Sequence, residues 1–325
     1  MIKVENLKRQ FDKRGIAGLN DLSLTLDQGQ VLAIMGPNGS GKTTLLKILA
    51  GEITSDSGSF STEGRVHLFS TKDESKDMNV QKFLVESVTL DVDEDKKIQL
   101  ARDLADTFEF TFQLRQNLME LSSGQKQKIL LAKELINRPS LLLMDEPFTH
   151  LDPFTRKDIL KGLFTYIRSQ GITVLWVTHD LEEAFQFSDS IGLMNFGKFE
   201  QFGSPEKLVQ QPRNLFVAKF MGYKNFFPVQ KQKSTWLTPW GEKEISGPET
   251  PDGILIIPDF AWKESEDGLT FKIISRHAGR QSTEYTLTTE ARTITLILGP
   301  KRELLPLKSK IKLTPVWDEC FIISL

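Results

Sequence analysis

The chain has 325 residues, 39% of them hydrophobic, and its acidic and basic residues nearly cancel to a net charge of −2. This length predicts two domains, or one large and one small domain, and the lack of a basic excess argues against nucleic acid as the main partner. The single cysteine, Cys320, excludes an internal disulfide bond and is typical of a reducing compartment. The four histidines do not cluster at the spacing of a zinc site.

No apolar run approaches the roughly 18 residues of a membrane-spanning helix. The first residues also lack the apolar core of a signal peptide. We therefore expect a cytoplasmic chain whose contact with a membrane would be peripheral and made through a partner.

The N-terminal segment, up to about residue 35, predicts strands with a turn at 27–30. Residues 22–26 alternate leucine with serine and threonine, which is typical of a half-buried strand. The apolar run 31–35 is the next expected strand.

The segment 36–43 reads G-P-N-G-S-G-K-T and fits the nucleotide-binding P-loop pattern G-x-x-x-x-G-K-[ST]. It lies between the apolar strand and a helix-like run at 44–49, which is the strand–loop–helix context that the motif requires. Its glycines let the backbone turn tightly and aim N–H groups inward, and the following helix adds the positive end of its dipole. The pattern therefore predicts a site for the phosphates of ATP.

Two side chains of this loop have a predicted chemical role. We expect Lys42 to reach the β- and γ-phosphates and the Thr43 hydroxyl to bind Mg²⁺. The predicted nucleotide-binding positions are Gly36, Pro37, Asn38, Gly39, Ser40, Gly41, Lys42, Thr43 and Thr44.

Residues 72–138 mix charged and apolar residues at helical spacing and predict a helical insertion. The segment Leu121–Gln125 starts an expected helix that runs to Asn137. Serine and glycine at this place could cap the helix. They could equally form a second anion site, because free N–H groups point outward from a helix N-terminus. The segment by itself leaves both readings open.

Asp145 and Glu146 directly follow the continuous apolar run 141–144, which predicts a central strand buried on both faces. Ligands of open α/β sheets lie at the carboxyl ends of strands, so we expect this acidic pair to face the P-loop. Asp145 suits a magnesium role, through water or Thr43. Glu146 suits the general base that activates the attacking water.

The C-terminal part of the chain differs in character. A helix at 155–169 and an apolar strand at 173–177 continue an alternation that implies a mostly parallel sheet. After about residue 230 helical periodicity nearly vanishes, and short alternating runs between turn residues predict a small β-barrel. The expected organisation is an α/β P-loop domain at 1–225 with a helical subdomain at about 72–138, a linker at 226–251, and an all-β, regulatory barrel domain at 252–325.

Five motifs occur in the order found in the ATP-binding cassette (ABC) ATPases, which the chain resembles over roughly residues 1–220. They are Gly36–Thr44, Leu121–Gln125, Leu143–Pro147, Leu151-Asp152 and Thr178-His179-Asp180. The resemblance implies that two chains pair head to tail around two ATP molecules. It also implies that a signature motif contacts the γ-phosphate bound by the other chain, and its residues here are Ser122, Ser123, Gly124 and Gln125.

The resemblance assigns three further residues. Asp152 matches the loop that links the two nucleotide sites. His179 matches the switch histidine that touches the γ-phosphate and supports the water at Glu146. Phe11 matches the aromatic residue that stacks on adenine, a contact for which any aromatic ring suffices. Taken alone, His179 and Phe11 would more often be structural.

The segments 201–208 and 216–222 resemble the tail of importer ATPases for ferric iron, polyamines, sulfate, molybdate or sugars, which carry a small β-barrel extension. This resemblance implies a homodimer on the inner face of the plasma membrane that works with membrane-spanning permease subunits and, indirectly, with a solute-binding protein. The implied cargo is an ion or small polar solute of the ferric-iron or polyamine class.

The chain departs from this pattern at a few positions. Ser70 stands where the family carries a glutamine, and a serine cannot reach magnesium and the attacking water as an amide could. The stretch 71–77 is unusually polar for a permease-docking surface. Ser123 replaces the first glycine of the usual pair, but it is small and keeps the backbone amide.

Two other functions compete with the importer. Soluble ABC ATPases that act on ribosomes or DNA carry paired cassettes or long coiled-coil inserts, and neither is visible here. A soluble ABC ATPase with weak hydrolysis and a regulatory domain that binds a small anion is the other alternative, which the serine at position 70 keeps open.

Overall fold

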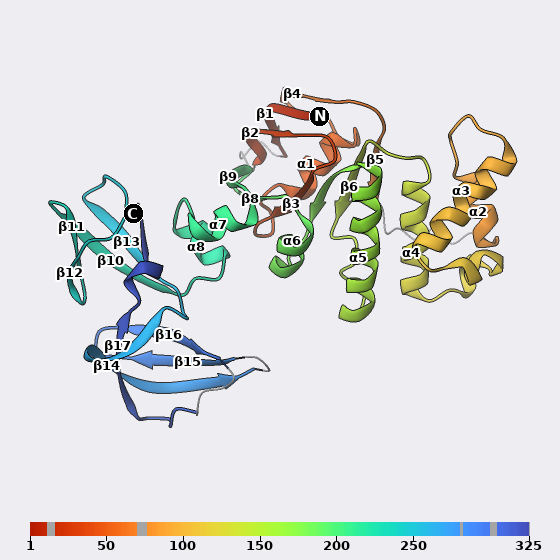
Figure 1. Ribbon diagram of the computed structural model, residues 1–325. Coiled ribbons are helices and arrows are strands. Elements are labelled where there is room, and N and C mark those ends of the chain that lie inside the picture. Colours follow the sequence, from red (N-terminus) through yellow and green to blue (C-terminus); the bar gives the residue numbers. More distant parts are fainter. Residues whose placement is uncertain (12–16, 70–76, 280–281, 300–303, 325) are drawn as a thin grey trace. The chain divides into compact units, whose positions relative to one another are not determined.

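The structure is a computed structural model that describes residues 1–11, 17–69, 77–279, 282–299 and 304–324 (Figure 1). The chain divides into two compact units, Met1–Pro205 and Glu206–Leu325. Within the described ranges, no helix combines the length and the apolar character needed to cross a bilayer.

The first unit is built on a six-stranded sheet in the order β5-β6-β7-β3-β8-β9. Its first five strands are parallel, and β9 runs antiparallel to β8. Their bounds are β3 (Val31–Met35), β5 (Val66–Phe69), β6 (Leu141–Asp145), β7 (Thr173–Val177), β8 (Ser190–Asn195) and β9 (Lys198–Gly203). The predicted strands at 31–35, 141–144 and 173–177 are confirmed as β3, β6 and β7, and these residues are buried because helices cover both faces of a parallel sheet.

Three helices connect these parallel strands: α1 (Lys42–Leu49), α5 (Pro153–Gln170) and α6 (Leu181–Phe187). The predicted helices at 44–49 and 155–169 are confirmed, and α5 begins two residues earlier than expected. Asp152 explains the earlier start of α5, because its side chain accepts hydrogen bonds from the backbone N–H groups of Phe154 and Thr155.

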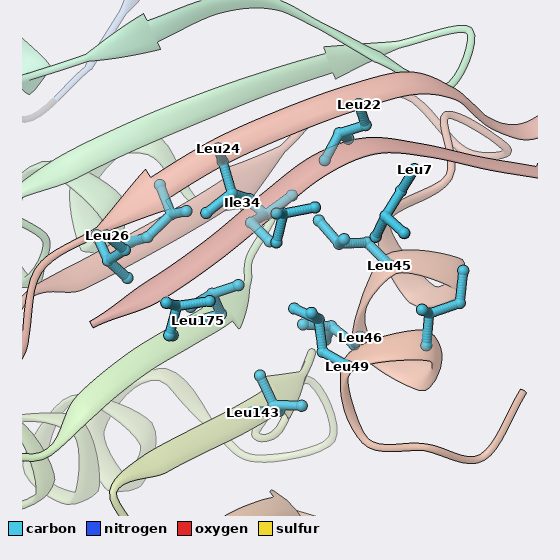
Figure 2. Close-up of a cluster of buried hydrophobic side chains, with 14 of the residues drawn as sticks. Leu7, Leu22, Leu24, Leu26, Ile34, Leu45, Leu46, Leu49, Leu143 and Leu175 are labelled. Carbon is cyan, nitrogen blue, oxygen red and sulfur yellow. The ribbon is translucent and has the colours of Figure 1, made fainter. Parts of the chain in front are cut away.

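A second sheet of the same unit is antiparallel, in the order β2-β1-β4. It contains β1 (Ile2–Gln10), β2 (Ala17–Leu26) and β4 (Ser57–Thr62). The leucines of β2 at positions 22, 24 and 26 face the central sheet, as their alternation predicts. They pack with Ile34 of β3, with leucines of α1, and with Leu143 and Leu175 of the neighbouring strands (Figure 2). This cluster anchors the strand and the helix that flank the P-loop.

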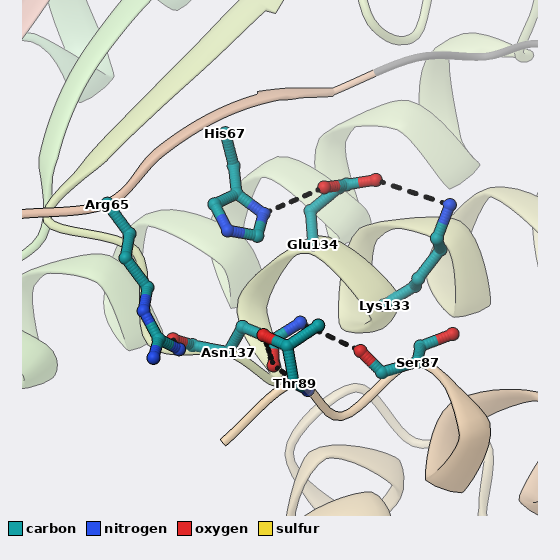
Figure 3. Close-up of polar contacts among 7 residues, drawn as sticks. All are labelled: Arg65, His67, Ser87, Thr89, Lys133, Glu134 and Asn137. Carbon is teal, nitrogen blue, oxygen red and sulfur yellow. Dashed lines mark hydrogen bonds and ion pairs between the residues drawn. The ribbon is translucent and has the colours of Figure 1, made fainter. Parts of the chain in front are cut away.

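The predicted helical insertion is confirmed over its described residues. It holds α2 (Val80–Glu86), α3 (Glu94–Thr107), the short 3-10 helices η1 (Thr111–Arg115) and η2 (Leu118–Glu120), and α4 (Ser123–Leu135). Asn137, just after α4, holds the insertion together because its amide bonds both Ser87 and Thr89 of the segment after α2 (Figure 3). The nearby contact between His67 and Glu134 joins β5 to α4.

The second unit carries two short helices and two antiparallel sheets. The helices are α7 (Pro205–Gln210) and α8 (Leu215–Phe220). One sheet has the order β12-β11-β10-β13-β18, and the other has the order β16-β15-β14-β17. The strands are β10 (Asn225–Gln232), β11 (Thr235–Thr238), β12 (Gly241–Lys243), β13 (Asp252–Ile257), β14 (Trp262–Ala278), β15 (Thr283–Thr288), β16 (Thr293–Leu298), β17 (Lys310–Pro315) and β18 (Phe321–Ser324), with the 3-10 helix η3 (Trp317–Glu319) before the last.

The two sheets share one hydrophobic core, to which Trp236, Leu255, Phe271 and Tyr285 contribute. The small all-β unit expected near the C-terminus is therefore present, but its extent differs from the expected boundaries. Strands β10 to β12 occupy the segment expected to be a linker, and the unit begins near residue 206. The turn-rich composition hid the alternation of Phe227 and Val229, which are buried, around the exposed Pro228.

Candidate nucleotide-binding and hydrolysis site

The loop 36–41 joins β3 to α1 and has the backbone conformations that only glycine adopts easily. Gly36, Gly39 and Gly41 have φ values of 143°, 78° and 104°. A Cβ atom on Gly36 would overlap the carbonyl oxygen of Met194 in β8, and one on Gly41 would overlap the carbonyl oxygen of Gly18 in β2. The loop is therefore clamped between two neighbouring strands, and its tips at 37–39 remain exposed.

Lys42 opens α1 and folds back over this loop. Its ammonium group donates hydrogen bonds to the carbonyl oxygens of Gly36 (2.9 Å) and Pro37 (3.0 Å), and the residue is only 6% exposed. Burial lowers the pKa of Lys42, and the nearby carboxylates of Glu146 and Asp145 act in the opposite direction. A cation held among backbone carbonyls next to exposed N–H groups is arranged to receive an anion.

Three hydroxyl-bearing residues lie close to this lysine in the chain. The hydroxyl of Ser40 is buried and has no hydrogen-bond partner among the residues that the structure describes. Thr43 is exposed on the first turn of α1, and Thr44 beside it is buried. A buried hydroxyl without a hydrogen-bond partner costs free energy. A phosphate oxygen next to the loop would remove this cost by accepting a hydrogen bond from Ser40.

The acidic pair lies at the carboxyl end of β6, as predicted. Asp145 is the last residue of that strand, in register with Val177 of β7. Glu146 follows with φ of 48°, and its backbone N–H donates to the carbonyl oxygen of Val177 at 3.2 Å. This turn of the chain carries the carboxylate of Glu146 to His179, whose Nε2 lies 2.5 Å from Oε1.

Phe11 lies next to the P-loop, although it is far from it in sequence order. The ring is exposed, and the guanidinium of Arg9 lies 5.5 Å from its centroid. A Cβ atom on Gly18 would overlap the Phe11 ring and would lie 3.1 Å from the methyl group of Thr44. Gly18 is therefore next to both the Phe11 ring and helix α1. The exposed ring is free to stack on a planar group.

The segment Ser122–Gln125 forms a capping box at the start of α4. The backbone N–H of Ser122 donates to Oε1 of Gln125 (3.0 Å), and the backbone N–H of Gln125 donates to the Ser122 hydroxyl (3.4 Å). Ser123 opens the helix, and a Cβ atom on Gly124 would lie 3.0 Å from the methyl group of Thr155 in α5. The two helix starts therefore lie side by side.

Asp152 caps the second of these helices. Its carboxylate accepts hydrogen bonds from the N–H groups of Phe154 and Thr155 at 3.1 Å each, and the bonds to Thr155 lower the pKa of Asp152. Among the residues in the described ranges, no hydrogen bond joins this pair of helix starts to the P-loop. The predicted site residues thus form two clusters: one around Lys42, and the other around Ser122 and Asp152.

A polar network that the sequence pattern does not predict lies next to His179. Arg156 of α5 contacts Glu183 of α6 at 2.6 Å, and the hydroxyl of Thr178 donates to the same carboxylate oxygen at 3.1 Å. A cavity of 260 Å³ lies beside this network and is lined in part by Glu146 and His179. In the sequence, Arg156 lies four residues after Asp152, and Glu183 lies four residues after His179. This spacing from predicted site residues is the only signal that the sequence offers for the network. Ser70, which stands where the family carries a glutamine, lies outside the described residues, as does the polar stretch after it up to residue 76.

The comparisons with known proteins agree with this geometry. Residues 19–149 match the family model described as ABC transporter. The chain is 34% identical over 271 residues to the sulfate/thiosulfate import ATP-binding protein CysA of Nitrosomonas europaea, an alignment that covers 76% of this chain and 72% of that protein. It is 35% identical over 241 residues to the spermidine/putrescine import ATP-binding protein PotA of Fusobacterium nucleatum, with 70% of this chain and 63% of that protein covered.

A solved structure has the same fold. It is a dimeric, post-hydrolysis state of an ATP-binding cassette bound to ADP and Pi, with a TM-score of 0.55 and 22% identity. The match covers 63% of this chain and 99% of the solved one. At this level of identity the likeness establishes the fold.

Proposed function

This chain belongs to the ABC transporter family and is an ATP-hydrolysing subunit, and from that premise we propose that it powers the import of a small solute. The single observation that carries the role in ATP hydrolysis is that three elements meet: the glycine-clamped loop with Lys42, the acidic end of β6, and His179. The role in import is proposed from the relatives named above. This arrangement offers cationic and N–H groups for phosphates on one side and a carboxylate on the other.

We assign ATP to the P-loop, with the triphosphate against the backbone N–H groups of 36–43 and against Lys42. The lysine would exchange its two backbone carbonyl partners for phosphate oxygens, which are stronger acceptors. Phe11 would stack on the base. Thr43 and Asp145 would hold Mg²⁺, an assignment that fits the ion because Mg²⁺ is usually bound by one or two protein groups together with phosphates and water.

Glu146 is assigned as the general base. Its carboxylate lies at the end of β6, and its hydrogen bond to His179 holds it in place. A positioned carboxylate accepts a proton from the attacking water and contributes about 10²–10⁴-fold to the rate. His179 keeps the carboxylate oriented and approaches the γ-phosphate.

The second cluster of site residues would act on the partner's nucleotide. The starts of α4 and α5 lie together, and α4, a helix of 13 residues, presents the backbone N–H groups of Ser123 and Gly124 between the capping residues Ser122 and Gln125. In a head-to-tail homodimer these groups would face the γ-phosphate bound by the other chain, with Asp152 between the two sites. The dimer would close because the phosphates neutralise facing helix ends, and loss of the γ-phosphate would open it.

The names of the relatives support a proposal about the transport partners. The relatives named above are import ATP-binding proteins for sulfate or thiosulfate and for spermidine or putrescine. We propose that this chain likewise binds permease subunits at the inner face of the membrane, and through them a solute-binding protein. The cargo class is an ion or a small polar solute, including polyamines and ferric iron.

A second candidate function concerns the all-β unit, which we propose is regulatory. A hollow of 790 Å³ in it is lined by Lys272, Arg292 and Lys310, with Glu290 as the acidic side chain. Lys272 and Lys310 lie directly opposite each other on β14 and β17, and like charges in this position repel. A bound small anion would relieve that repulsion. Co-purification of a multi-span membrane subunit favours the importer, and a chain that acts alone favours an anion-regulated soluble ATPase.

The test of the hydrolysis site is Glu146→Gln. The amide keeps the shape of the side chain but cannot accept the proton, so ATP should still bind while turnover falls at least 100-fold. The trapped dimer should elute ahead of the monomer in size-exclusion chromatography with Mg-ATP. Glu182→Gln on the exposed face of α6 is the matched control and should behave as wild type. A monomeric Glu146→Gln variant with undiminished turnover would refute the assignment.

A further inference from the structure

Two ion pairs tie α5 to the chain that follows β7. At the start of the helix, Nη2 of Arg156 lies 2.6 Å from Oε2 of Glu183, and the two side chains are 22% and 14% exposed. At the end of the helix, Arg168 pairs with Asp189 at 3.0 Å, in a more exposed setting. Only the first pair lies next to the predicted hydrolysis site.

The first pair has a third member, Thr178, which precedes His179 and hydrogen-bonds the backbone of Asp180, the residue after it. The Thr178 hydroxyl donates to Oε2 of Glu183 at 3.1 Å and accepts a hydrogen bond from the backbone N–H of Asp180 at 3.1 Å. Thr178 is 3% exposed. The residues on both sides of His179 are thus held by one hydroxyl, which is itself held by the carboxylate of Glu183.

The start of α6 fixes the backbone of Glu183. The backbone N–H of Glu183 donates to Oδ1 of Asp180 at 3.1 Å, which caps the helix. Because Glu183 is bonded through both its backbone and its side chain, its position relative to the turn at 178–180 is well defined. Arg156 then connects this turn to α5, the helix that Asp152 caps.

The packing around His179 gives these polar contacts their importance. The 260 Å³ cavity is lined by Glu146, His179, Arg156 and Glu183, among others. This cavity opens to solvent, so the side chains that border it have no packing partner on that side. The hydrogen bonds of Thr178 and Glu183 therefore restrain the turn that carries His179, in addition to the contact between His179 and Glu146.

We propose that Arg156, Glu183 and Thr178 form a positioning strut that holds His179 against Glu146. The proposal rests on the proposed roles of Glu146 and His179 in ATP hydrolysis. The strut acts through the turn and touches neither the nucleotide nor the attacking water. A shift of α5, the helix that Asp152 caps, reaches His179 through Arg156, so the strut also couples the second cluster of site residues to the hydrolysis site.

The most direct test compares Thr178→Val with Thr178→Ser in the full-length chain. Valine has the shape of threonine but removes the hydroxyl, whereas serine keeps it. Misplacing a reacting group by about 1 Å can cost roughly 10²-fold in rate, so we expect Thr178→Val to lower kcat about tenfold or more. The Kd for ATP should stay within about twofold, because no phosphate-binding group changes, and Thr178→Ser should retain the wild-type kcat.

The second test breaks the ion pair at either end of α5. Arg156→Gln should lower kcat to a similar extent as Thr178→Val, and Arg168→Gln, which breaks the pair at the other end of the same helix, should leave kcat unchanged. Removing one partner of this partly buried pair leaves the other charge unpaired and is destabilising. If Arg156→Gln does not fold, the paired variant Arg156→Met with Glu183→Gln, which leaves no unpaired charge, replaces it.

The outcomes separate the strut from the proposed function. An inactive Glu146→Gln variant together with a fully active Thr178→Val variant would overturn the strut and leave the proposed hydrolysis site in place. Full activity of Glu146→Gln would instead refute the hydrolysis site. Equal losses of kcat in Arg156→Gln and Arg168→Gln would show that the pair contributes to folding alone.

Discussion

The substitution Asn137→Ala should loosen the helical insertion without touching the nucleotide site. Asn137 is 5% exposed, and its side chain makes three hydrogen bonds to the segment after α2 (Figure 3). Its Oδ1 accepts from the backbone N–H of Thr89 (2.7 Å) and from the Thr89 hydroxyl (3.0 Å), and its Nδ2 donates to the carbonyl oxygen of Ser87 (2.9 Å). The substitution removes all three bonds together.

The expected cost follows from these contacts. A hydrogen bond contributes a net 0.5–1.5 kcal/mol, so three bonds correspond to roughly 1.5–4.5 kcal/mol. Thr89 is exposed, and water will replace part of what it loses, which places the expected loss near about 2 kcal/mol. For a unit of this size that loss lowers the melting temperature by about 4–8 °C.

Differential scanning calorimetry of the full chain measures this shift in the transition of the first unit. Asn79→Ala is the matched control, since Asn79 is exposed and its side chain accepts one hydrogen bond, from the backbone N–H of Lys82 at 2.8 Å, as the cap of α2. Losing such a cap costs about 1 kcal/mol. A shift for Asn137→Ala no larger than that for Asn79→Ala would refute the reasoning.

Two further predictions concern single ionisable groups. Lys42→Ala should abolish ATP binding in isothermal titration calorimetry because it removes the buried cation of the P-loop. Lys47→Ala, on the same helix, is the control and should bind ATP as the wild type does. A Lys42→Ala variant that binds ATP with micromolar affinity would contradict the assignment. Burial raises the pKa of the Cys320 thiol to about 12, and since the thiolate is the reactive species, a thiol reagent at pH 8 should label Cys320 only after unfolding. Labelling of the folded chain should rise as the pH approaches that value, and rapid labelling at pH 8 would show that the thiol is not buried.

The sequence predicts those parts of the fold whose signal is local. The P-loop needs glycines with positive φ at fixed positions, so its pattern identified both the loop and its neighbouring strand and helix. The strands β6 and β7 are buried on both faces, which leaves an uninterrupted apolar run. Asp145 and Glu146 could be placed because they directly follow such a run.

Contacts between distant segments left no comparable signal. Arg156 and Glu183 are 27 residues apart, and either would be read from the sequence as a solvated charge on a helix. The same holds for Asn137, whose partners lie about 50 residues earlier. The strands at 225–243 were missed because proline, lysine and turn residues outnumber the buried aromatic residues that define them.

The clamp around Gly36 bears on how inactive relatives of such chains should be recognised. The carbonyl oxygen of Met194 leaves no room for a side chain at this position whether or not a nucleotide is present. A descendant that had lost its chemistry would still need this glycine in order to assemble its sheet. Retention of Gly36 in a relative therefore indicates that the fold is retained. Retention of Lys42 and Glu146, which the fold does not require, indicates an active enzyme.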